Sequence, residues 1–302
     1  MINILLILVF LSLGLILQGK PFLPKDTARY LNQYLIYIVL PALALKHLPG
    51  IELKADLLLP VASAWICFGI SWLFFSQLGK RLSWSRGLTG CLIIVAGLGN
   101  TSFVGIPVIQ ALLGQEAIQI ALLIDQAGSF ILVSSLAIIV ASNYGEDKKR
   151  KRDIAGKILS FPPFVFFVIA IGLNLMKIEI PGTAEMIFGW IAMTLTPVAL
   201  TSVGLQLQVN MQAIRTPYLW IGLSYKLIAI PLFIFVVFKY VFPLEGLMFK
   251  VTVLETAMAP MITGSIVAIS NNLEPKLASL MVGVGIPLSF FTLAIWYGIL
   301  LL

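Results

Sequence analysis

Apolar runs long enough to cross a lipid bilayer follow one another along almost the whole chain, and this pattern constrains the fold more than any other feature. Hydrophobic residues make up 60% of the 302 residues and charged residues only 11%, whereas soluble domains are roughly 25% charged. A membrane-spanning helix needs about 20 apolar residues. The sequence therefore predicts an all-α integral membrane protein with about ten spanning helices and no separate soluble domain.

The expected helices form two sets. The first set covers about 3–18, 30–45, 57–78, 88–113 and 117–142, and the second about 158–176, 184–207, 217–241, 247–271 and 276–301. An odd number of spans per set gives the two sets opposite orientations, which is the inverted-repeat plan of many secondary transporters. We predict a first five-helix repeat over residues 1–142, a basic cytoplasmic loop over 143–157 and a second, inverted repeat over 158–302.

The fourth helix of each predicted repeat is interrupted by glycine or proline. In the stretch GLGNTSFVGIPVIQALLG, residues 97–114, we expect Pro107 to open the hydrogen-bond ladder back to about Phe103. A second break is expected at Pro260, within residues 253–270. Open backbone survives at membrane depth only where protein or water surrounds it, and in transporters it often marks the substrate site.

Lysine and arginine set the expected orientation. Loops after the odd-numbered helices hold 14 of these residues and the opposite loops hold 5, which predicts cytoplasmic odd loops and both termini outside the cytoplasm. The net charge of +7 is thus explained by the lipid bilayer, without a nucleic acid partner. Cys67 and Cys91 lie in apolar runs and His47 is the one histidine, so we expect no disulfide framework and no metal site.

Four of the expected helices share a pattern with a known family. The residues are Asn100, Thr101, Phe103, Gly105, Pro107 and Gly114 in the fourth helix, PVALTSVGLQL in the seventh, Lys226 and Pro231 in the eighth, and AMAP in the ninth. This pattern resembles the auxin efflux carriers, a family that includes the plant PIN proteins and bacterial malonate and malate carriers. The resemblance covers essentially the whole chain. The short loop between the fifth and sixth helices is closer to the bacterial members, so a plant hormone substrate is not implied.

In that family two broken helices cross at their prolines, and the substrate carboxylate lies near the crossing in a unit that moves against a scaffold. The resemblance implies substrate contacts by Asn100, Thr101, Pro107, Ala259 and Pro260, a scaffold of helices 1, 2, 6 and 7, and a homodimer through that scaffold. A half-helix that starts at a break presents free N–H groups and about half a positive charge, which suits a small organic anion. Alternatively, the polar side chains only satisfy the opened backbone.

Four further polar residues in the apolar runs are candidates for ion coupling or for the substrate pathway: Asp125, Glu255, Lys226 and Gln206. An intramembrane carboxylate is costly and suggests an ion or proton path, so Asp125 could carry a proton in one state of a cycle. Glu255 could do the same or lie near a membrane surface. Lys226 is expected near a helix end or beside a carboxylate, and Gln206 at the border of the cavity. Protons and Na⁺ are both candidate coupling ions, and no bound cofactor is expected.

These features predict a secondary transporter in the cell membrane that moves a small carboxylate by elevator-like alternating access, and not an enzyme. The one histidine lies at a helix end, which argues against a serine and histidine pair in an intramembrane protease. Asp125 and Glu255 lack the flanking motifs of aspartyl proteases. A transporter-like sensor or a channel for a small anion is the alternative function.

Overall fold

The computed structural model describes residues 2–145, 159–207 and 215–302, and these ranges are helical apart from short connections and one β-bridge between Gly99 and Pro260. Five helices in the described ranges are long and apolar enough to cross a membrane, and shorter apolar helices accompany them. The all-α prediction is therefore confirmed. Most of the predicted basic loop at 143–157 lies outside the described residues, and the division into inverted repeats stays a prediction.

The helices lie close to the predicted ranges, but many consist of several pieces. In the first half they are α1 (Ile2–Leu17), α2 (Thr27–Tyr34), η1 (Leu35–Val39), α3 (Leu40–His47), η2 (Ala55–Leu57), α4 (Leu58–Arg81), α5 (Arg86–Gly97), η3 (Thr101–Gly105), α6 (Ile106–Leu113), α7 (Ala117–Leu123), η4 (Ile124–Phe130), α8 (Ile131–Ser134) and α9 (Leu136–Tyr144). In the second half they are α11 (Pro162–Leu175), α12 (Gly182–Met193), α13 (Leu195–Gln206), α14 (Pro217–Ser224), η6 (Tyr225–Ala229), α15 (Ile230–Val236), η7 (Val237–Val241), α16 (Gly246–Thr256), α17 (Ile262–Ser270) and α18 (Pro275–Ile299).

Three of the prolines inside these helices follow a π-helical turn by two residues: Pro41 after η1, Pro107 after η3 and Pro231 after η6. A proline cannot donate to the carbonyl four residues earlier and collides with it. The wider π-turn relieves this conflict, because its hydrogen bonds reach back five residues. At η3, for example, the Ile106 N–H donates to the Thr101 carbonyl. The helices therefore continue through these three prolines.

The expected position of the first interruption was wrong for this reason. The helix runs without a break from Thr101 to Leu113, through Pro107. The backbone leaves the helix earlier, at Leu98, which is extended with φ −110° and ψ 132°. In the ninth predicted helix the interruption lies between α16 and α17 and contains Pro260, as expected.

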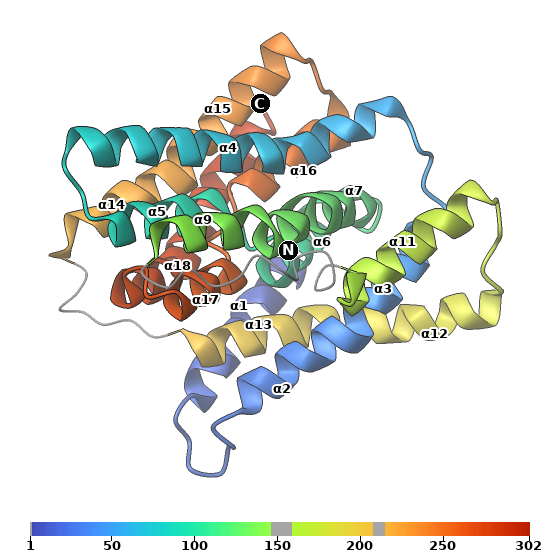
Figure 1. Cartoon of the computed structure of the whole chain (residues 1–302). Coiled ribbons are helices and arrows are strands. Elements are labelled where there is room, and N and C mark those ends of the chain that lie inside the picture. Colours follow the sequence, from blue (N-terminus) through green and yellow to red (C-terminus); the bar gives the residue numbers. More distant parts are fainter. Residues whose placement is uncertain (1, 146–158, 208–214) are drawn as a thin grey trace.

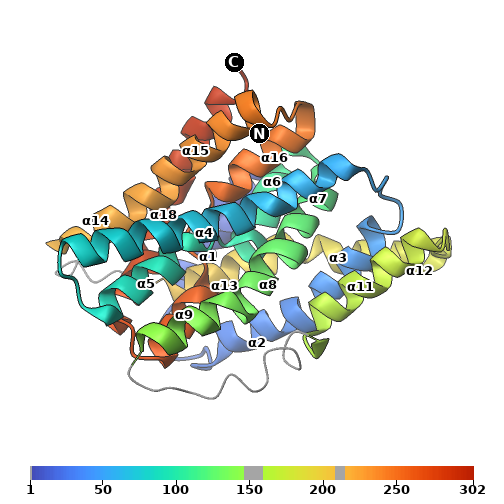
Figure 2. The same cartoon turned by 45° about the horizontal axis from the view of Figure 1, so that its top comes forward.

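The helices form two groups (Figures 1 and 2). One group contains α1, α2, α3, α11, α12 and α13, with α1 against α13 and α3 against α11 and α12. The other contains α4, α5, α9 and α14 to α18, with α4 against α5 and α17 against both α5 and α18. The segment η3–α6 contacts both groups, because it packs on α1 and α13 as well as on α7 and α16.

Two glycines bring α1 and α13 into backbone contact. A Cβ atom on Gly204 would overlap the Leu11 carbonyl oxygen and lie 2.9 Å from the Gly14 Cα. A Cβ on Gly14 would lie 2.8 Å from the Gly204 Cα. Small residues of this kind let membrane helices approach closely, where van der Waals packing replaces the hydrophobic effect as the source of stability. The pair therefore fixes the distance between the two helices.

Candidate functional site

The two interruptions pair with each other through their backbones. The Asn100 N–H donates to the Ala259 carbonyl at 2.8 Å, and the Met261 N–H donates to the Leu98 carbonyl at 3.1 Å. All four residues are at least 93% buried. Buried backbone groups must be hydrogen-bonded, and this pairing satisfies them where the helices stop. The side chains of the interruptions are therefore not needed to repair these backbone groups.

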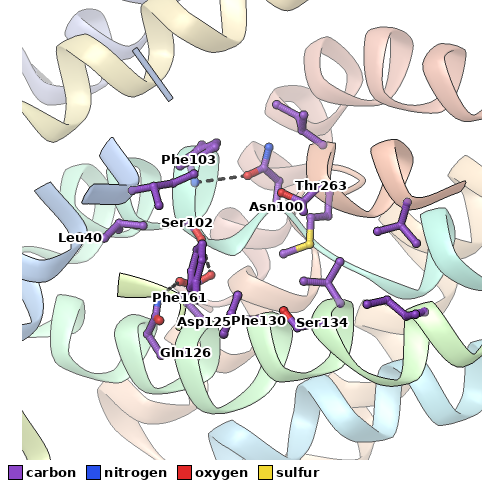
Figure 3. Close-up of a pocket in the computed structure, with 16 residues that line it drawn as sticks. Leu40, Asn100, Ser102, Phe103, Asp125, Gln126, Phe130, Ser134, Phe161 and Thr263 are labelled. Carbon is purple, nitrogen blue, oxygen red and sulfur yellow. Dashed lines mark hydrogen bonds between the residues drawn. The ribbon is translucent and has the colours of Figure 1, made fainter. Parts of the chain in front are cut away.

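A cavity of about 290 Å³ adjoins the paired interruptions, and we call it the Asn100 cavity (Figure 3). Its walls are mostly apolar and include the rings of Phe103, Phe130 and Phe161. The other lining residues are Ile36, Leu40, Asn100, Ser102, Asp125, Gln126, Val133, Ser134, Ile138, Met261, Ile262, Thr263 and Val267. Asn100 and Thr263 enter it from the two interrupted helices, and Asp125 and Gln126 from η4 (Figure 3). The volume suits a small organic molecule.

Asn100 brings an unused hydrogen-bond donor to this cavity. Its Oδ1 accepts from the Phe103 N–H at 3.2 Å, which caps the start of η3 and fixes the side chain. Its Nδ2 has no partner among the described residues, although the residue is only 3% exposed. A buried donor without a partner costs roughly 1–3 kcal/mol. An acceptor on a ligand would remove this cost.

The start of α17 is a second donor at the cavity. The first turn of this helix has neither a side-chain cap nor an acidic residue, while Ile262 and Thr263 line the cavity. The free N–H groups and the positive end of the helix dipole are thus uncompensated there. Such a helix start attracts anions.

The start of η3 differs, because Asp125 already occupies it. One carboxylate oxygen of Asp125 accepts from the hydroxyls of Thr101 and Ser102 at 2.5 Å each, and the other accepts from Gln126 Nε2 at 2.6 Å. Asp125 is 1% exposed. A carboxylate at a helix start is stabilised by the dipole. The Thr101 hydroxyl thus donates to Asp125, and its contact with a substrate stays a prediction.

We expect Thr101→Val to lower the melting temperature of the purified protein by a few degrees. Valine keeps the shape but removes the hydroxyl that donates to Asp125, and a hydrogen bond to a charged group contributes about 2 kcal/mol. Thr263→Val is the matched control, because the structure records no hydrogen bond for the Thr263 hydroxyl within the described ranges. Equal melting temperatures for the two variants would contradict the prediction.

Glu255 and Lys226 lie beside the paired interruptions but do not line the Asn100 cavity. They line a cavity of about 20 Å³, which we call the Lys226 cavity, together with Leu98, Gly99 and Thr256. Lys226 is 2% exposed and its Nζ donates to the Thr256 carbonyl at 3.0 Å. Glu255 is 1% exposed, and neither carboxylate oxygen has a hydrogen-bond partner in the described part of the chain.

The expectations for these residues gave alternatives, and the structure excludes one of each. Lys226 does not lie near a helix end, because η6 is in the middle of the helical run Pro217–Val241; it lies beside a carboxylate, since Glu255 lines the same cavity, and it donates its hydrogen bond to the Thr256 carbonyl. Glu255 does not lie at an exposed surface, because α16 carries it into the protein core beside the interruption. Asp125 is buried inside the fifth helix, as predicted.

The remaining predicted site residues lie around this centre. Pro107 lines a separate cavity of about 440 Å³ with Gln110, Gly114 and Pro197, among others. Gln206 donates to the Ser202 carbonyl and hydroxyl on its own helix and is not among the residues lining the three cavities described here. Ala259 and Pro260 contribute backbone to the pairing described above. Their contacts with a substrate stay predictions.

Sequence reasoning missed four polar residues of the Asn100 cavity: Ser102, Gln126, Ser134 and Thr263. Ser102 and Thr263 carried a usable signal, because each follows an interruption by two or three residues and so lies in the first turn of the resumed helix. Gln126 directly follows Asp125 in the same apolar run. Ser134 carries no local signal.

Comparison with known proteins gives matches that cover almost the whole chain. Residues 1–297 match the model of a family described as membrane transport protein. An uncharacterised transporter of Methanothermobacter thermautotrophicus is 28% identical over 298 residues, covering 97% of this chain and 96% of its own length. An uncharacterised transporter of Methanocaldococcus jannaschii is 25% identical over 308 residues, covering 99% of this chain and 98% of its own length. These matches confirm the resemblance inferred from the interrupted helices.

Proposed function

Because the chain belongs to the membrane transport protein family of the auxin efflux carrier type and is a multi-pass membrane protein, we propose that it moves a small organic anion across the cell membrane. The observation that carries this proposal is the unpaired Asn100 Nδ2 in the same cavity as the uncompensated start of α17. A carboxylate would accept from both donors. The chain acts as a carrier in this proposal and performs no covalent chemistry.

The lining of the Asn100 cavity limits the kind of anion. Among the described residues that line it there is no lysine, arginine or histidine, so attraction from these residues comes from dipoles and not from a full positive charge. The three phenylalanine rings and the aliphatic residues would pack against an apolar body. Asp125 would repel a second negative group on the ligand. An anion with one carboxylate and an apolar body therefore fits better than a dicarboxylate.

The Asn100 cavity and the cavity lined by Pro107, which we call the Pro107 cavity, support alternating access. The Asn100 cavity extends to Ile138 of α9 and Val267 of α17, whereas the Pro107 cavity lies beside Gly114, at the opposite end of α6. The paired interruptions adjoin the Asn100 cavity and would serve as the crossing of two broken helices. The group containing α1, α2, α3 and α11 to α13 would be the scaffold and would form the homodimer contact, and the other group would move against it. The basic loops predict that the Asn100 cavity faces the cytoplasm.

Asn100→Asp tests the binding site, and we expect it to weaken carboxylate binding by at least about tenfold. Aspartate keeps the oxygen that caps Phe103, so η3 should start unchanged. It removes the Nδ2 donor and adds a negative charge next to the ligand. Binding would be measured by thermal shift with aliphatic and aromatic monocarboxylates and short dicarboxylates, and transport by uptake into proteoliposomes.

Asn32→Asp is the matched control, because Asn32 bonds to Ser202 and lies outside the Asn100 cavity. This control should bind like the wild type. The assignment of this binding site would be overturned if Asn100→Asp bound carboxylates as tightly as the wild type. It would also be overturned if the wild type bound no carboxylate. A ligand that binds but does not cross would identify a sensor, and flux far above carrier rates would identify a channel.

A further inference from the structure

Two helix C-termini converge on the Lys226 cavity. Helix α5 ends at Gly97 and α16 ends at Thr256, and both residues line the cavity. The last carbonyls of a helix lack intrahelical partners and carry about half a negative charge. In transporters with broken helices, such ends and the unwound carbonyls beside them are the groups that coordinate coupling cations. Two helix ends at one cavity would attract a positive charge.

Glu255 adds a full carboxylate to these carbonyls. A Cβ on Gly105 would lie 2.5 Å from one carboxylate oxygen and 2.9 Å from the other, so the carboxylate packs directly against the backbone of η3. Both oxygens lack a partner among the described residues, although Glu255 is 1% exposed. A buried charge must be compensated by a nearby opposite charge. Among the described residues that line this cavity, Lys226 is the one with a cationic side chain.

Lys226 places its ammonium on the last carbonyl of α16, and no ion pair joins it to the Glu255 carboxylate among the described residues. Its Nζ lies 3.0 Å from the Thr256 carbonyl oxygen. A Cβ on Gly99 would lie 3.1 Å from the same Nζ and 3.3 Å from the Glu255 carbonyl oxygen, so Gly99 leaves the space through which the ammonium approaches. The remaining volume of about 20 Å³ has room for roughly one water-sized particle. The ammonium therefore occupies most of the site.

We propose that the Lys226 ammonium is the resident cation of the paired interruptions, filling a site in which Glu255 and the C-terminal carbonyls of α5 and α16 would otherwise hold a monovalent metal cation such as Na⁺. The covalently attached charge cannot dissociate, so the wild-type protein needs no Na⁺ to keep the two interruptions together. Removal of the ammonium leaves oxygen ligands of the kind that hard cations prefer. The variant should therefore acquire a Na⁺ site.

The test compares wild type and Lys226→Met as purified full-length proteins in detergent. Methionine keeps an unbranched apolar stem and removes the charge. Melting temperatures would be measured in NaCl and in choline chloride at equal ionic strength. We expect Na⁺ to raise the melting temperature of Lys226→Met by several degrees with a saturating dose dependence, since a ligand that binds only the folded state stabilises it. The wild type should melt at the same temperature in both salts.

Two further variants define the site. Lys226→Met combined with Glu255→Gln should lose the Na⁺ response, because the carboxylate is gone. Lys239→Met, which removes an exposed lysine that lies over the Phe235 ring, should respond like the wild type. Na⁺ stabilisation of the wild type, or a Lys226→Met protein that folds and does not respond to Na⁺, overturns the proposal. If Lys226→Met does not fold in either salt, the proposal is tested by two other measurements. These are the comparison of the wild type in the two salts and the Na⁺ response of Lys226→Ala, which leaves more room. No arm uses an organic anion, so the outcome is independent of the proposed substrate.

Discussion

Gly204→Val is expected to lower the melting temperature by about 10 °C or more, or to prevent folded protein from accumulating. Even the first carbon of the new side chain would overlap the Leu11 carbonyl and press on the Gly14 Cα. Both are backbone atoms, which cannot move aside without separating α1 from α13. Overpacking of this kind costs about 3 kcal/mol. Folded yield by size-exclusion chromatography and thermal melting would measure the effect.

A graded series and a matched control make this prediction specific. Gly204→Ala should melt between the wild type and Gly204→Val, because its single carbon meets the same backbone atoms. Gly172→Val is the control, since a Cβ on Gly172, also within an apolar helix, would meet no atom within 4 Å. Equal loss of folded protein in the two valine variants would show that valine itself, and not the contact of α1 with α13, is responsible.

Asp125→Asn is expected to abolish transport driven by a pH gradient while leaving the protein folded. Asp125 is the one titratable residue among the described residues that line the Asn100 cavity, so we propose that it carries a coupling proton. Asparagine has the same shape and can still accept from Thr101 and Ser102. The new N–H₂ group would face the Gln126 amide, whose Oε1 has no partner within the described ranges. A rotation of that amide therefore supplies the missing acceptor.

The measurement is accumulation of a labelled carboxylate in proteoliposomes with and without an imposed pH gradient. Substrate binding should depend on pH in the wild type and become independent of pH in Asp125→Asn. Asp56→Asn, at an exposed position in η2, is the matched control and should transport normally. Glu255→Gln tests the other buried carboxylate. Carboxylate accumulation by Asp125→Asn that still follows the pH gradient would refute the proton-carrying role of Asp125. If Glu255→Gln loses this accumulation, the role belongs to Glu255.

The helical architecture could be predicted because lipid leaves few alternatives. Runs of about 20 apolar residues must satisfy their own backbone hydrogen bonds, so helix ranges such as α4 and α18 follow directly from hydropathy. The second interruption was also predictable, since Pro260 follows Ala257 and Ala259 in a run with small residues. The position of the first interruption was not predictable from Pro107. A π-helical turn accommodates that proline within a continuous helix, and the backbone leaves the helix at Leu98.

The sequence by itself therefore determined the fold class, the family and the residues from which a site could be built, because apolar run length and local motifs are properties of neighbouring residues. Only the tertiary structure decided which of those residues meet. It paired Gly99 with Pro260, placed Asp125 on the start of η3 so that Asn100 and the start of α17 remain free, and set the Lys226 ammonium on the end of α16. These contacts join residues that are far apart in the chain. Packing in three dimensions selects the partners, and no local sequence pattern specifies them.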